Sequence, residues 1–536
     1  MAKETETVFQ KFGTYVWENV TLNRQPTIWF FALVIGLTVA HAAIGFWELI
    51  RVVQWIAFRT ASEELFPQVA LLPWWQVLFL PAIGGVFIGL FLQNVMGRQR
   101  MLSVADVIES RTLHGGRVDL RTAMLNAVGT SASLGVGASA GREGPVVHLG
   151  AAIASEIGHR LGYSGVVTRT LLGCGVAAAV SASFNAPLAG VLFALEVVLG
   201  HYALRAFGPI VISSVAAAVT SRIYLGEFPA FIVPVDRITT YWEMPAFALL
   251  GLICGLVAMI FMRAIMYTDD FASKVECPLW MRPAIGGLML GAIAIYFPQV
   301  LGVGYGATDA ALNEQFGFTL LVSLIVAKTA ATAITMASRF GGGVFSPSLY
   351  LGAMTGGAFG ILAAQIFPDQ ATSHAAYALV GMGAVSAAVL GAPISTTLIV
   401  FELTGEWRLS LAVLVAVSIA TVFTQSRLGK SFFHWQLERR GLHVREGAHA
   451  YILKMLRVRD IMETSDVPEN PPTGLPALTA DNTLGEALKI FDETEADTLL
   501  VYSNDTSEQP IGLISHTDAL KAFNRALIER NVEEHR

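Results

Sequence analysis

The sequence predicts an all-α polytopic membrane protein with two related halves and broken helices, followed by a small α/β domain. Three observations predict it: the composition, a series of apolar segments interrupted by glycine and proline, and an internal repeat. Of 536 residues, 54% are hydrophobic and only 14% are charged, whereas soluble proteins carry roughly 25% charged residues. Because polar groups cannot cover the surface of such a chain, much of that surface must face lipid.

Composition and motif content also narrow the classes of function. A net charge of −6 gives no reason to expect a nucleic-acid partner. The three cysteines lack metal-site spacing, and we interpret them as small buried side chains. Neither a His/Asp/Glu cluster with metal spacing nor a nucleophile–base pair accompanies the broken segments. We therefore expect a protein that is not an enzyme, binds no metal and requires no cofactor. The polar, acidic start of the chain predicts no secretory signal peptide.

The chain begins with ordinary membrane elements. Within an N-terminal region of residues 1–27, residues 8–24 have the pattern of an amphipathic helix on the cytoplasmic membrane surface. Two long apolar segments follow, at about 28–49 and 74–96. Each is close to the roughly 20 residues needed to cross the hydrocarbon. We expect both to be complete spans of a transmembrane region covering residues 28–429.

After the second span, the apolar segments become short and rich in glycine and alanine. They lie at 125–140, 146–157, 168–183 and 188–199. Each is too short to cross a membrane as an ordinary helix. Helices that stop inside a membrane are tolerated where their free backbone lines a cavity or is buried in protein. The interruptions therefore predict a transport site.

An internal repeat relates two halves, at about 28–225 and 244–426. Seven residues of the first half recur 206 positions later: among them, Gly175, Ala186, Pro187 and Glu196 reappear as Gly381, Ala392, Pro393 and Glu402. A second block, Gly141 and Pro145, recurs 202 positions later as Gly343 and Pro347. The two blocks predict a pseudo-two-fold architecture with a site where the breaks converge. Repetition of the glutamates favours a structural role near helix ends, and we expect Lys328 to be a satisfied buried cation.

The stretch Gly141-Arg142-Glu143-Gly144-Pro145 places two charged side chains between apolar segments. An ionisable residue at membrane depth is costly and points to function. The glycines permit an irregular turn, and proline suits the first turn of a helix. The pattern predicts the Glu143 carboxylate at a helix N-terminus. An ordinary first-turn glutamate that stabilises its own helix is the alternative interpretation.

The chain turns polar after residue 429. Residues 430–457 read as a linker whose basic residues place this end in the cytoplasm. Residues 458–536 read as a small α/β domain. Its expected helices lie at 484–492 and 517–529, and its expected strands at 498–503 and 511–515.

Three motifs, in this order, resemble the CLC family of chloride channels and chloride/proton exchangers. They are the 141–145 stretch, Phe184-Asn185-Ala186-Pro187-Leu188-Ala189-Gly190 and Gly342-Gly343-Val344-Phe345-Ser346-Pro347. The resemblance covers roughly residues 20–445, and the tail resembles one CBS motif. It implies a homodimer, with two inverted halves and one anion pathway in each subunit. Chloride and protons would be the substrates, and the inner membrane of a prokaryote the location, with both termini cytoplasmic.

The resemblance also assigns site residues. It implies that Glu143 gates the pathway and carries the proton, while the backbone at Gly144, Val344 and Phe345 holds the anion. A helix N-terminus presents unpaired N–H groups and about half an elementary positive charge, which suits a chloride that must also leave. For Arg142, near the outer mouth, two interpretations stay open: it draws anions in, or it simply extends to water.

Two departures from the family pattern affect the anion site. Leu102 stands where the family usually has a serine that touches the central anion, with Ser103 as a neighbour that could replace it. Phe433 aligns with a tyrosine whose hydroxyl completes that site. Because each lost hydrogen bond to a charged partner costs about 1.5–3 kcal/mol, we expect weak central binding. A sub-millimolar chloride affinity in isothermal titration would contradict this expectation.

A third departure concerns the mechanism. Many exchangers of the family carry a second glutamate beside the one matching Glu196, and this chain has Val197 there. We expect chloride/proton exchange, with a passive gated chloride channel as the alternative. Transport of nitrate is a lesser alternative. Fluoride also fits less well, since Pro145 after Gly144 is typical of the chloride-type group.

The CBS motif supplies one further expected site. Ser515 and Asp518 match positions that often contact the ribose and phosphates of an adenine nucleotide. The alternative is a purely structural dimerisation module. Because such motifs usually pair, a single motif predicts pairing across the dimer.

Overall fold

The structure is a computed structural model, and it divides the chain into two compact units, Met1–Phe433 and His434–Arg536. The described residues are 24–60, 65–97, 100–163, 165–226, 231, 243–367, 373–405, 408–442, 453, 456–464, 478–494, 496–503 and 510–535. Residues 8–23 of the predicted amphipathic helix at 8–24 lie outside them.

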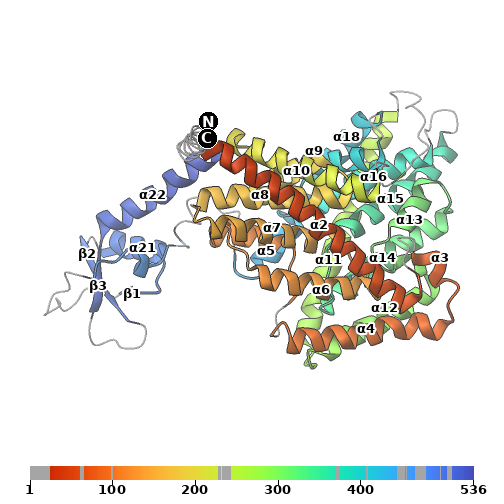
Figure 1. The fold of residues 1–536 in the computed structure, drawn as a ribbon. Helices are drawn as coiled ribbons and strands as arrows, with labels where there is room; N and C mark the ends of the chain where they lie inside the picture. The colour runs from red at the N-terminus through yellow and green to blue at the C-terminus, as the bar shows by residue number, and fades with distance from the viewer. Residues whose placement is uncertain are drawn as a thin grey trace, which may run out of the picture. The chain divides into compact units, whose positions relative to one another are not determined.

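The first unit is entirely helical in its described part, as predicted, with α2 running obliquely past several other helices (Figure 1). The helices of its first half are α2 (Arg24–Phe58), α3 (Leu65–Val69), α4 (Trp74–Asn94), α5 (Val104–Leu113), α6 (Leu120–Gly135), α7 (Glu143–Arg160), α8 (Gly165–Phe184), α9 (Pro187–Phe193), the π-helix η1 (Ala194–Leu199) and α10 (Leu204–Leu225).

The second half repeats this arrangement of long and short helices. Its elements are α11 (Met244–Lys274), α12 (Met281–Tyr296), the 3₁₀-helix η3 (Pro298–Val300), α13 (Tyr305–Leu312), α14 (Phe318–Ala337), α15 (Phe345–Ile366), α16 (His374–Leu390), α17 (Pro393–Thr404) and α18 (Ser410–Leu428). Helix α19 (Phe432–Glu438) follows and contains the boundary between the two units. In the described part of the chain, eight helices are long and apolar enough to cross a membrane. The protein is therefore an integral membrane protein.

Several predicted segments differ in length from the helices of the structure, and three helices are longer than expected. Helix α2 continues past the expected end at 49, and α7 and α8 are longer than the segments expected at 146–157 and 168–183. Charged residues end an apolar segment in the sequence, but they need not end a helix. In α7, for example, Glu156 pairs with Arg160 at 2.6 Å, so the helix continues through both. Helix α8 is long enough to cross alone.

Equivalent glycines allow the helix pairs of the two halves to pack closely. A Cβ at Gly150 of α7 would lie 2.5 Å from the carbonyl oxygen of Gly175 in α8. In the other half, a Cβ at Gly352 of α15 would lie 2.3 Å from the carbonyl oxygen of Gly381 in α16. These distances are too short for any side chain, so both pairs depend on glycine. The repeat seen in the sequence thus corresponds to two copies of one packing arrangement.

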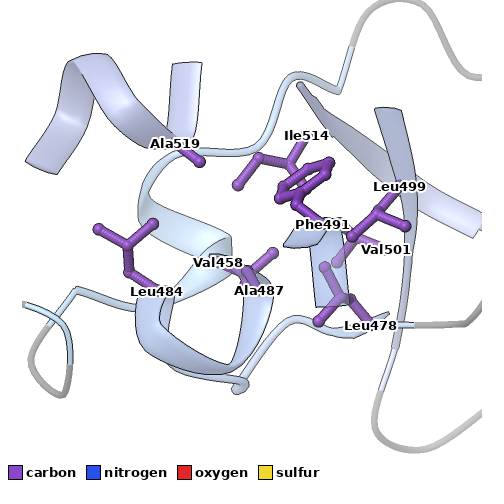
Figure 2. Packing of buried hydrophobic residues seen from close by; sticks show 9 residues of the cluster. All are labelled: Val458, Leu478, Leu484, Ala487, Phe491, Leu499, Val501, Ile514 and Ala519. Atoms are coloured by element: carbon purple, nitrogen blue, oxygen red, sulfur yellow. The ribbon is translucent and has the colours of Figure 1, made fainter. Parts of the chain in front are cut away.

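The second unit contains the predicted small α/β fold. Strands β1 (Leu478–Thr479), β2 (Thr498–Tyr502) and β3 (Pro510–Ser515) form one sheet in the order β1-β2-β3. The β1–β2 pair is parallel and the β2–β3 pair antiparallel. The helical elements are η4 (Val458–Asp460), α21 (Leu484–Thr494) and α22 (His516–His535). Figure 2 shows the core, in which Phe491 lies among aliphatic side chains from the helices and the sheet.

Candidate functional site

Two helix N-termini from opposite halves are joined at their first turns. The N–H of Gly141 donates to the carbonyl of Gly343 at 2.7 Å, and the N–H of Gly343 donates back to Gly141 at 2.7 Å. Helix α7 begins at Glu143 and α15 at Phe345, each two residues after its paired glycine. The glycines that the repeat relates in sequence are thus direct partners in space.

This backbone pair brings the positive ends of α7 and α15 together. The residues before the two helices, Arg142 and Val344, have similar backbone angles, with φ/ψ of −85/−17° and −97/−4°. The first N–H groups of a helix have no acceptor within it, and they carry the positive end of its dipole. The junction is therefore suited to a bound negative charge.

The Glu143 carboxylate occupies this junction. The side chain comes from the first turn of α7, and Glu143 is only 3% exposed. Its Oε1 accepts hydrogen bonds from the Tyr305 hydroxyl, at 3.1 Å, and from the Ser346 hydroxyl. Ser346 lies in the first turn of α15. A carboxylate from one half is thus held at the helix N-terminus of the other half.

The second carboxylate oxygen lies in a tight space. Oε2 of Glu143 is buried and has no hydrogen-bond partner among the described residues. A Cβ at Gly141 would lie 2.5 Å from this oxygen and 3.1 Å from the backbone nitrogen of Ser346. Glycine at position 141 therefore leaves the room that the carboxylate fills.

The predicted anion-binding residues of the two helix starts lie at the same junction. A Cβ at Gly144 would lie 3.6 Å from Cα of Gly343 and 3.3 Å from Cβ of Ser103. Val344 and Phe345 are buried at the start of α15. The Phe345 ring packs on Phe184, with ring centroids 4.8 Å apart. Its side chain is thus part of an apolar wall, while its backbone belongs to the helix N-terminus.

Leu102 and Ser103 have different surroundings. The N–H of Leu102 donates to Oδ1 of Asn126 at 2.8 Å, and the Asn126 amide donates to the Leu102 carbonyl at 2.9 Å. Ser103 precedes α5, and its N–H donates to Asp106 at 2.7 Å. The Cβ of Ser103 lies 3.3 Å from the position that a Cβ at Gly144 would take. Both backbone N–H groups are therefore engaged, and Ser103, at the start of α5, lies close to Gly144.

Phe433 lies apart from these contacts. It is buried in the second position of α19, and its ring packs edge-on against Phe432 at 6.3 Å. Among described residues, no hydrogen bond or ring contact joins it to Glu143 or Phe345.

Arg142 lies beside the gating candidate. Its guanidinium lies over the Tyr305 ring, 4.9 Å from the ring centroid, and Nη2 donates to the Ser183 carbonyl at 3.4 Å. Arg142 also lines a cavity of about 220 Å³ together with Trp47 and Asn185. An arginine in a cavity wall can attract anions, and its stacking on Tyr305 links it to the residue that bonds Glu143.

Sequence reasoning assigned no role to Tyr305 or Ser346, although both contact the Glu143 carboxylate. A role for Ser346 could have been predicted, because Ser346 follows Phe345 in the motif at 342–347. Tyr305 gave a weaker signal: a polar aromatic residue among glycines, in Gly302-Val303-Gly304-Tyr305-Gly306. Nothing local shows that this loop meets a carboxylate 162 residues earlier.

Glu196 and Glu402 have the structural role that their repetition predicted. The Glu402 carboxylate accepts from the N–H groups of Leu188 and Ala189, at 3.0 and 2.8 Å, at the start of α9. Glu196 accepts from Ile394 and Ser395, at 3.1 and 2.8 Å, at the start of α17. Each glutamate thus caps a helix of the opposite half.

In the second unit, Ser515 and Asp518 bond each other. The Ser515 hydroxyl donates to Oδ2 of Asp518 at 2.6 Å, and the Asp518 N–H donates to Ser515 Oγ at 3.0 Å. The Ser515 hydrogen bond, followed by that of Lys521, lowers the pKa of Asp518. The pair caps the start of α22, and its carboxylate is ionised at neutral pH.

Comparisons with known proteins agree on one family. The family model described as voltage gated chloride channel matches residues 84–425. A protein of Ralstonia nicotianae described as a ClcB-like chloride channel is 32% identical over 386 residues, which cover 71% of this chain and 90% of the relative.

Two solved structures show the same fold. A slow cyanobacterial Cl⁻/H⁺ antiporter has a TM-score of 0.69 at 23% identity, covering 78% of this chain and 98% of the other. A CLC-type fluoride/proton antiporter has a TM-score of 0.63 at 22% identity, covering 76% and 97%. Sequence identities this low establish a shared fold, but they do not establish a shared substrate.

Proposed function

Because this chain belongs to the CLC family of voltage-gated chloride channels, it is an anion transport protein, and we propose that it exchanges chloride for protons under the control of Glu143. The observation that carries the proposal is the position of the Glu143 carboxylate. It lies buried at the joined N-termini of α7 and α15, bonded to Ser346 of the opposite half. An ionised carboxylate there occupies a place that favours any anion.

Protonation would release the gate. A proton added at Oε2, the oxygen without a partner among the described residues, neutralises the carboxylate. The neutral group no longer interacts strongly with the helix dipoles, so chloride can take its place. When the proton leaves toward the other side, the carboxylate regains its charge and displaces the anion. One group would thus alternate between carrying a proton and excluding chloride.

We propose that the central anion is bound mainly by backbone N–H groups at Gly144, Val344 and Phe345. The Leu102 N–H is engaged by Asn126, and neither Leu102 nor Phe433 has a side-chain donor. Leu102 and Ser103 both precede α5. Of the two, Ser103 has a hydroxyl group and lies close to Gly144, so we propose it as the replacement for the missing side-chain donor. Chloride is the proposed anion, because the curated relative reported above is described as a chloride channel.

A passive gated channel is the second candidate, and the absence of a carboxylate at Val197 favours it. Exchange is favoured by the gate itself, a buried carboxyl group that can carry a proton at the place where an anion would bind. Purified protein in liposomes with an outward chloride gradient should move protons against their own gradient as chloride leaves. Chloride efflux without any proton signal at a pH electrode would rule out exchange and leave the channel.

We propose that the protein is a homodimer in the inner membrane of a prokaryote, with both termini in the cytoplasm. Basic residues after the last span support this orientation, among them Arg439 and Arg440. Cross-linking in native membranes would test the dimer, and a monomer under all conditions would contradict it.

We propose that an adenine nucleotide binds the second unit at Ser515 and Asp518. The two side chains lie together at the start of α22. A hydroxyl and an ionised carboxylate suit the hydroxyl groups of a ribose. Equilibrium dialysis of the full chain with ATP, ADP and AMP should show binding that Asp518→Ala weakens at least about tenfold, as loss of a charged hydrogen bond requires. If none of the three binds, the unit is a structural module.

A further inference from the structure

We propose that Lys328 is a positioning residue for the gate: its buried ammonium group holds the loop that presents the Tyr305 hydroxyl to Glu143, and so sets the pH at which the carboxylate leaves the anion pathway. This inference rests on the proposed function of Glu143. It assigns a role to a buried charge that the exchange mechanism does not otherwise use.

Lys328 is a fully buried lysine whose Nζ is held by backbone carbonyls. It lies in α14 at 0% exposure, and Nζ donates to the carbonyls of Val300 and Gly302, at 3.0 and 3.1 Å. Its ammonium also lies 5.0 Å from the centroid of the Tyr350 ring. No carboxylate in the described part of the chain pairs with it. A buried charge without a counter-ion is expensive, so this arrangement needs a reason beyond packing.

The two carbonyls belong to the segment that leads directly to Tyr305. Val300 ends η3, and Gly302 and Gly304 both have positive φ, at +64° and +93°. A Cβ at Gly304 would lie 3.3 Å from Nζ of Lys328 and 2.8 Å from the Tyr350 ring. The side chains of Lys328 and Tyr350 therefore pack against the backbone of Gly304, one residue before Tyr305. The ammonium fixes the backbone from which the gate-contacting hydroxyl extends.

Tyr305 transmits this position to Glu143. Its hydroxyl donates to Oε1 at 3.1 Å, and its ring is held between the Phe231 ring, at 5.6 Å between centroids, and the guanidinium of Arg142. A hydroxyl that donates to a carboxylate stabilises the ionised form over the neutral form. Lys328 therefore acts on the carboxylate through the placement of the Tyr305 hydroxyl.

Loss of the ammonium should therefore favour proton uptake by Glu143. With the ionised carboxylate less stabilised, the neutral form appears at a lower proton concentration, and the gate opens at higher pH. Other ionisable groups lie on or close to α7: Arg142, His148 within the helix, and the Arg100–Asp106 pair at α5. All of them are kept in the variants below.

The test is chloride flux from liposomes as a function of pH, with the full-length protein. Lys328→Met should move the pH of half-maximal flux upward by about 0.5–1 unit, less than the roughly 1–3 units of a directly adjacent charge, because Lys328 acts through Tyr305. Lys328→Arg, which keeps the charge, should recover most of the wild-type profile. Tyr350→Phe is the matched control, because it keeps the ring and removes a hydroxyl that has no partner among the described residues.

A Glu143→Gln background separates a role at the gate from a general structural role. In that background, Lys328→Met should cause no further change in the pH profile, since the titrating group is absent. An equal change in both backgrounds, or an unchanged profile in a folded Lys328→Met protein, would overturn the inference.

Tyr305→Phe provides a second route if Lys328→Met does not fold. It removes only the hydroxyl and should also shift the profile upward, whereas a wild-type profile would overturn the inference. The proposed function fails separately, if Glu143→Gln itself leaves both pH dependence and proton coupling intact.

Discussion

Glu143→Ala should abolish proton transport and leave a chloride flux that no longer depends on pH. The substitution removes the charge that occupies the joined N-termini of α7 and α15 and the only group proposed to carry the proton. We expect proton movement to fall to the level of empty liposomes, a loss of at least about tenfold if the carboxyl acts as the transfer group. Simultaneous recording with chloride and pH electrodes measures both flows.

A matched control lies on the same helix. Glu156 is a carboxylate of α7 that pairs with Arg160 near the far end, so Glu156→Ala removes an equal charge without touching the junction. It should leave coupled transport unchanged. If Glu143→Ala still moves protons uphill, Glu143 is not the proton carrier, and another buried group must replace it in the mechanism.

Much of the architecture could be predicted because it rests on local patterns. Long apolar runs predict spans, and paired blocks of glycine and proline predict two halves. Helix ends were less predictable, because charged residues such as Glu156 and Arg160 form pairs within a helix and let it continue. The hydropathy of a segment falls at each charged residue, but it does not show whether that residue is paired within the helix.

The candidate site was predictable only in part. The charged turn and its glycines marked Glu143, and the repeat marked Gly343 as a counterpart of Gly141. The contacts that hold the carboxylate arise where distant loops meet, as Tyr305 does with Glu143 across 162 residues. Likewise, nothing in the sequence near Leu102 shows that Asn126 engages both its N–H and its carbonyl.

Gly141→Ala should open the pathway while leaving the Glu143 side chain in place. The new Cβ would lie 2.5 Å from Oε2 and 3.1 Å from the backbone nitrogen of Ser346. The backbone tolerates alanine, because Gly141 is not among the residues with positive φ. The carboxylate is the more mobile neighbour, so we expect it to be expelled. Chloride flux at neutral pH should rise several-fold, with fewer protons moved per chloride.

The effects of Gly141→Ala and Glu143→Ala on chloride flux should not be additive. If alanine at position 141 acts by displacing the carboxylate, it should have almost no further effect in a Glu143→Ala background, where no carboxylate remains to displace. Gly45→Ala in α2, where the added Cβ meets nothing within 4 Å, controls for the change of residue type and should behave as wild type. Equal effects of Gly141→Ala in both backgrounds would instead locate its action in the Gly141–Gly343 backbone pair. The space at Gly141 would then serve the helix junction and not the gate.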